Sequence, residues 1–160
     1  MLKGLLPGYA HLQNVHPLLV HFPLAFLPGA VLSYALAWVS RREYWAWAGL
    51  WMLALGTLGA AAAAASGLYS ADGVMIARSV RANLLQPHKQ LMLAVLALSA
   101  ALLLWAAATR PWPARARAVF LGLLAAMMAG LILGADYGGR MVYDYNAGGN
   151  ACPQPIEFQG

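Results

Sequence analysis

The sequence predicts an all-α integral membrane protein in which four helices form an up-down-up-down bundle. Of the 160 residues, 62% are hydrophobic and only 9% are charged, whereas a soluble domain has about 25% charged residues. Four apolar stretches reach the length of about 20 residues that a helix needs to cross a bilayer. Short turns join two pairs of these stretches, as in an antiparallel bundle. The composition excludes a soluble globular domain, a disordered chain and a collagen-like repeat.

The four spans are expected at residues 17–39, 44–68, 89–108 and 117–135. A turn at Ser40–Glu43 joins the first two spans, and a basic, proline-broken turn at Thr109–Arg117 joins the last two. The second connection, Tyr69–Pro87, is longer and amphipathic and is expected to be a loop. The apolar run before Pro7 is too short for a cleaved signal peptide, so the first span is expected to stay in the protein.

These elements divide the chain into a transmembrane domain at residues 1–145 and an extended C-terminal tail at 146–160. The tail is rich in glycine and proline and has no spanning capacity. It is interpreted either as a segment that lies on a partner or as a disordered end.

The distribution of charge predicts the orientation of the bundle in the membrane. The formal net charge of +5 does not come from a long basic run, so no nucleic-acid partner is expected. The two short turns contain five arginines: Arg41, Arg42, Arg110, Arg115 and Arg117. Because positive charge gathers on cytoplasmic loops, both termini and the long middle loop are expected on the periplasmic side. All six tryptophans fall near the arginine-rich ends, where indole rings suit the headgroup boundary.

Small residues recur at helical spacing in the second and fourth spans. Such stripes allow helix backbones to approach closely in lipid. Close helix packing is therefore favoured over a ligand groove on these faces, which carry Gly49, Gly56, Gly59, Ala63 and Gly67 in the second span and Gly122, Ala126, Gly130 and Gly134 in the fourth.

The histidines gather at the outer end of the predicted bundle: His11, His16, His21 and His88. Imidazole is a common iron ligand. His21 and His88 are expected at similar depth on different helices, which suits opposite axial ligation of one haem b, with His16 as the alternative to His21. The chain lacks a zinc ligand set. Its lone cysteine, Cys152, allows neither an internal disulfide nor a covalently attached haem.

The same residues have structural interpretations, which the sequence leaves open. His16 is placed to cap the first helix, His21 to bond a carbonyl freed by Pro23, and His88 to lie solvated at the interface. Another metal or a quinol is a further alternative. Four basic residues at this end are candidates to neutralise haem propionates or to extend to the interface: Arg78, Arg81, Lys89 and Arg140.

Two segments resemble a bacterial membrane family catalogued as domain of unknown function 2231. Residues 14–25, NVHPLLVHFPLA, match its HPxxVHFPxA-type motif, and residues 136–143, DYGGRMVY, resemble its GGxxVY segment. The resemblance extends from about Asn14 to Gly149. It implies four helices, His16, His21 and Pro23 as motif positions, and His88 as the histidine that opens the third helix. Relatives often occur beside or fused to c-type cytochrome modules, which implies respiratory electron transfer. Relatives carry a histidine before GGxxVY where this chain has Asp136 and Tyr137, so a second haem is not expected.

Three classes of function follow. The first is a haem b subunit that passes single electrons between a periplasmic c-type cytochrome, or a partner subunit, and a respiratory complex in the membrane, without independent enzyme activity. The second is a cofactor-free anchor or scaffold for a larger complex. The third is a quinol-reactive or transport protein, which the scarcity of charged groups in the spans disfavours. Asp136 is then expected to be an interfacial helix-end residue.

Overall fold

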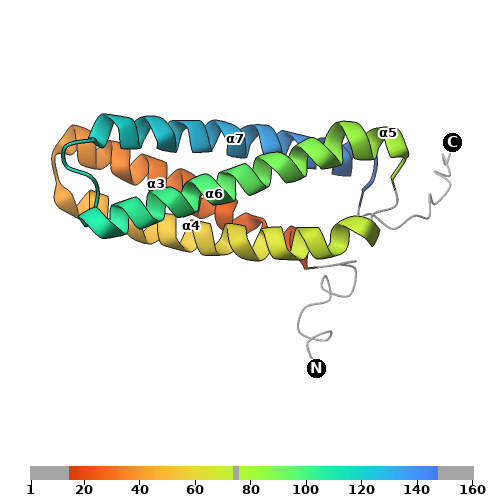
Figure 1. The fold of residues 1–160 in the computed structure, drawn as a ribbon, viewed down its shortest axis with the longest axis horizontal. Coiled ribbons are helices and arrows are strands. Elements are labelled where there is room, and N and C mark those ends of the chain that lie inside the picture. The colour runs from red at the N-terminus through yellow and green to blue at the C-terminus, as the bar shows by residue number, and fades with distance from the viewer. Residues whose placement is uncertain (1–14, 74–75, 148–160) are drawn as a thin grey trace, which may run out of the picture.

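The computed structural model describes residues 15–73 and 76–147, and in these residues the chain forms an antiparallel bundle of four long helices without a strand (Figure 1). The first helix comprises α2 (His16–Leu19) and α3 (His21–Ser40), and the second comprises α4 (Glu43–Ser70) and the 3₁₀ turn η2 (Ala71–Gly73). The third comprises α5 (Arg78–Val80), the π-helical turn η3 (Arg81–Leu85) and α6 (Gln86–Thr109), and the fourth is α7 (Arg117–Tyr143). All four are long and apolar enough to cross a membrane. The predicted four-helix fold is confirmed.

Glycines hold α3 and α4 close together along their length. A Cβ atom added to Gly49 would lie 2.8 Å from the Tyr34 ring, and one added to Gly56 would lie 2.6 Å from Leu27. These side chains therefore occupy the space that a larger residue on α4 would need. The stripe on the second span is a packing surface between helices, as the sequence indicated. On α7 the pattern is mixed, because Gly130 faces Val95 on α6 whereas Gly122 has nothing within 4 Å.

Aromatic side chains close the arginine-rich end of the bundle. Tyr34 is fully buried, and its hydroxyl donates a 3.0 Å hydrogen bond to the Pro111 carbonyl. Its ring lies 5.9 Å from Trp112 and 4.9 Å from Phe120, measured between ring centroids. Trp112 is only 6% exposed, so it differs from the expected tryptophan at the headgroup boundary. The turn between α6 and α7 folds it back over the end of the core.

The second connection is mostly helical, which corrects the expected loop at Tyr69–Pro87. Helix α4 continues through Ser70, and the third helix begins at Arg78. Val80, Leu84 and Leu85 are buried against Met141, on the part of α7 that extends beyond the predicted span. This small second core explains the extension, because the amphipathic segment has an apolar helical face that needs a partner.

A π-helical turn accommodates Pro87 within the third helix. Proline has no backbone N–H and its ring crowds the carbonyl four residues earlier. Here the Gln86 N–H bonds the Arg81 carbonyl, five residues back. The wider turn relieves the crowding, and π-helical turns of this kind often occur at functional sites. His88 consequently lies well inside the third helix and not at its start.

The chain continues beyond α7 for a few described residues. The Ala147 N–H donates a 2.9 Å bond to the Met141 carbonyl, and Ala147 packs against the small second core. The rest of the expected tail, residues 148–160, lies outside the described residues, as does His11.

Candidate functional site

His16 is held against the second helix by its Nδ1 atom. This atom lies 2.9 Å from the Ala63 carbonyl oxygen and 3.1 Å from Ser66 Oγ, and the Ser66 hydroxyl donates to the same carbonyl. The Ala63 carbonyl oxygen can only accept a hydrogen bond, and the Ser66 hydroxyl proton is donated to that same oxygen. The proton in the bond between His16 and Ala63 therefore belongs to Nδ1. In the neutral ring Nε2 then carries the lone pair, which is the form in which imidazole binds a metal.

His88 is held in the same way on the other hairpin. Its Nδ1 atom lies 2.7 Å from the Gly134 carbonyl oxygen of α7, so Nδ1 is again the donor and Nε2 again carries the lone pair. The hydrogen bond connects the third helix to the fourth, just as the His16 bond connects the first to the second.

A glycine lies under each imidazole ring. A Cβ atom on Gly67 would lie 2.8 Å from His16 Cε1, and one on Gly138 would lie 3.2 Å from His88 Cε1. Each glycine stands four residues after the carbonyl that accepts the bond, since Ala63 precedes Gly67 and Gly134 precedes Gly138. Residues four apart share one face of a helix. In both hairpins, therefore, a backbone carbonyl and a glycine four residues after it position the histidine.

His16 and His88 lie at the same end of the bundle, on the first and third helices. Their rings are within range of a Coulombic interaction when both are charged, and both are half-buried. In the described part of the chain, no group of three or more histidine, cysteine, aspartate or glutamate side chains is placed to hold a metal ion. The candidate site therefore consists of two histidines and not of three or more metal-ligating side chains.

His21, which the sequence pairs with His88, lies on the exposed side of the first helix, and that pairing stays a prediction. Its side chain is exposed, and its Nδ1 atom lies 3.4 Å from the Leu18 carbonyl on its own helix. Five residues on a helix are separated by about 140°, so His21 points away when His16 points inward. His88 lies ten residues after Arg78, where the third helix begins, whereas the sequence predicted His88 at the start of that helix.

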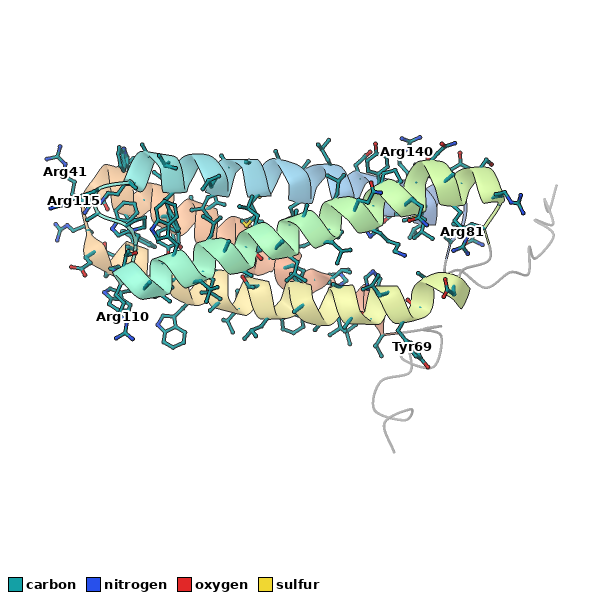
Figure 2. All side chains as sticks on the ribbon, in the orientation of Figure 1. Arg41, Tyr69, Arg81, Arg110, Arg115 and Arg140 are labelled. Atoms are coloured by element: carbon teal, nitrogen blue, oxygen red, sulfur yellow. The ribbon has the colours of Figure 1, made fainter. Side chains whose placement is uncertain are left out.

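The four basic candidates stand at the same end of the bundle as the histidine pair. Figure 2 labels two of them, Arg81 and Arg140, at the end opposite Arg41 and Arg115. The Arg81 guanidinium donates to the Ala71 carbonyl at 3.2 Å, and Arg140 pairs with Asp144 at 3.7 Å. Arg78 is exposed, whereas Lys89 is half-buried beside His88. Asp136 is exposed on α7.

The sequence analysis missed the residues that orient the histidines. Ser66 and the carbonyls of Ala63 and Gly134 carry no sequence signal of their own, because any residue supplies a carbonyl. Gly67 and Gly138 did carry one, since both are small residues inside long helices. Gly67 was assigned to helix packing, and Gly138 stood within the GGxxVY-like segment without a stated role.

Comparison with known proteins identifies a family for this sequence. A family model described as a predicted membrane protein, DUF2231, matches residues 12–151. No curated protein and no solved structure matches the chain.

Proposed function

The chain belongs to the DUF2231 family of predicted membrane proteins, and from this premise and the histidine pair we propose that it is a haem b-binding electron-transfer subunit. His16 and His88 are the residues that would hold the haem iron. The observation that carries the proposal is the shared orientation of the two rings. Each donates Nδ1–H to a backbone carbonyl, an arrangement typical of histidines whose Nε2 binds a metal.

A histidine pair suits haem better than a simple metal ion. A structural zinc site needs four protein ligands, and a catalytic one needs three. The described residues offer no such group. Haem brings four nitrogen ligands of its own, so two imidazoles complete the iron coordination.

The surroundings of the pair match the two parts of a haem. Met92 and Leu91 on α6 lie toward Gly134 of α7, and Val95 is buried below them, so the third helix supplies apolar contacts for a porphyrin. Toward the end of the bundle the side chains become basic. Arg78, Arg81, Lys89 and Arg140 are the proposed partners of the propionate groups, because guanidinium and ammonium groups pair with carboxylates.

The chain itself contributes orientation and burial. The Ala63 and Gly134 carbonyls fix the plane of each imidazole and increase its basicity. Gly67 and Gly138 let the rings lie against the helix backbones. When bound, haem supplies one-electron transfer, and its potential depends on the two imidazoles, their hydrogen bonds and the exclusion of water.

The proposed location is the bacterial cytoplasmic membrane, with the arginine-rich turns in the cytoplasm and both termini in the periplasm. The density of arginine on the two short turns supports this orientation. The histidine pair then lies toward the periplasmic surface, where a c-type cytochrome or another subunit of a membrane complex is the proposed redox partner.

The visible spectrum of the purified protein tests the proposal. We expect split Soret and α bands of low-spin haem b after reduction with dithionite, with one haem per chain by the pyridine haemochrome method. Expression with an added haem precursor ensures that the haem supply in the cell does not limit the fraction of chains that bind haem. A haem-free protein that co-purifies with other membrane subunits would overturn the proposal and favour the anchor function.

A further inference from the structure

A hollow of about 730 Å³ lies at the arginine-rich end, opposite the histidine pair. It is formed between the turn that joins α3 to α4 and the turn that joins α6 to α7. Four of its lining side chains are arginines, and two tryptophans complete much of its wall: Arg41, Arg42, Arg110, Arg117, Trp38 and Trp112. Figure 2 shows Arg41 and Arg110 at this end, on the two different turns.

Among the described residues, acidic side chains do not balance the positive charge of this hollow. Glu43 is the one acidic residue in its lining, against four arginines. The ion pair found in the described residues, Arg140–Asp144, is at the other end of the bundle. Arg110 Nε donates to the Ala107 carbonyl at 3.3 Å, and the Arg117 guanidinium lies 4.6 Å from the centre of the Trp112 ring. Neither contact supplies a negative charge, so the hollow favours an anion.

A helix N-terminus adds to this positive potential. Both α4 and α7 begin at the hollow, and neither has a side-chain hydrogen bond at its N-cap. The first turn of α7 also lacks an acidic residue. Free N–H groups at the start of a long helix favour an anion. Because Glu43 stands in the first turn of α4, the N-terminus of α7 is the one that adds to the positive charge of the arginines.

The anion must also suit the boundary of a membrane. Val39, next to Trp38 of the hollow, is 78% exposed, and Leu32, about two turns earlier on the same face of α3, is 62% exposed, so apolar side chains lead from beside the hollow along the lipid-facing side of the bundle. A phosphate that carries acyl chains fits both parts of this surface. We propose that the hollow binds the phosphodiester headgroup of an anionic phospholipid, with its acyl chains along α3.

Lipid titration followed by native mass spectrometry tests this proposal. Delipidated full-length protein in detergent is titrated with dioctanoyl phosphatidylglycerol, dioctanoyl phosphatidylcholine or inorganic phosphate. We expect the anionic lipid to bind about tenfold more tightly than the zwitterionic lipid. Arg42→Gln and Arg110→Gln should each weaken its binding about fivefold.

Arg115→Gln is the matched control, because Arg115 stands on the same turn as Arg110 but does not line the hollow. It removes the same charge and should leave the affinity unchanged. Equal weakening by Arg110→Gln and Arg115→Gln would overturn the proposal in favour of diffuse charge attraction. Inorganic phosphate that binds as tightly as the lipid, or equal binding of the two lipids, would also overturn it. Melting temperatures of the variants confirm that each is folded.

Discussion

Each histidine of the candidate site lies against a glycine of the neighbouring helix. The Gly67 and Gly138 positions leave room for an imidazole directly against the helix backbone. The neighbouring carbonyl then selects the Nδ1–H tautomer. At the scale of residues, the candidate site therefore requires glycine at these two positions as well as the two histidines.

Gly67→Ala tests this relation. The added Cβ would lie 2.8 Å from His16 Cε1, so the ring must move and its bond to the Ala63 carbonyl must lengthen. We expect a loss of about 1–3 kcal/mol in the free energy of unfolding, together with lower haem content. Chemical denaturation and the haemochrome assay measure the two effects.

Gly122→Ala is the control for that change, because the same substitution meets nothing within 4 Å. It should keep full haem content and be at least as stable as the parent, since alanine favours a helix over glycine. Equal haem content and stability in the two variants would contradict the packing role of Gly67.

The helices illustrate what the sequence can and cannot predict. Spans of apolar residues marked all four elements and both short turns, because length and hydropathy alone decide whether a helix crosses a bilayer. They did not mark the helical extensions beyond the predicted spans. Val80 and Leu84 are buried by contact with Met141, which is distant in sequence, and no local pattern revealed that α7 would continue far enough to cover them.

The same limit applied to the histidines. Their gathering at one end followed from the order of the spans, but which two face each other depends on helix rotation. Successive residues differ by 100° around a helix, so His16 and His21, five residues apart, point about 140° from each other. The apolar spans give the position of each helix along the chain but not this rotation.

Leu84→Ala tests the second core at the scale of elements. Leu84 is 4% exposed, so its truncation should lower stability by about 2–4 kcal/mol, or open the segment around residues 78–85 locally. Hydrogen exchange of that segment measures the local effect.

Leu104→Ala, at a site 72% exposed on the bundle surface, is the comparison. Lipid can fill the space that this side chain leaves, so we expect little change in either measurement. If Leu84→Ala exchanges no faster than Leu104→Ala, the second core does not stabilise the extension.

At the scale of the whole molecule, the bundle has two chemically distinct ends. One carries the hollow lined by arginines and two tryptophans, where Figure 2 labels Arg41 and Arg110. The other carries the histidine pair and is the end where Figure 2 labels Arg81 and Arg140. The antiparallel order of the helices produces this separation, because it places both short turns at one end. A membrane across the bundle would then keep the proposed lipid site and the proposed haem site on opposite sides.

Cysteine labelling measures that orientation. The chain has a single cysteine, Cys152, in the C-terminal part beyond the described residues. With the C-terminus in the periplasm, a membrane-impermeant maleimide added to spheroplasts should label it. In the Cys152→Ala/Ala114→Cys variant the cysteine moves to the turn between α6 and α7, and labelling should require permeabilised membranes. The reverse pattern would contradict the positive-inside assignment.

The central claim is that His16 and His88 together hold one haem. Reduced-minus-oxidised spectra of three alanine variants test it most directly, at equal protein concentration. His16→Ala and His88→Ala should each lose the low-spin bands, whereas His21→Ala, an exposed position on the same helix as His16, should keep them. Loss of the bands in His21→Ala with retention in His16→Ala would contradict the account and return the iron to the pairing of His21 with His88.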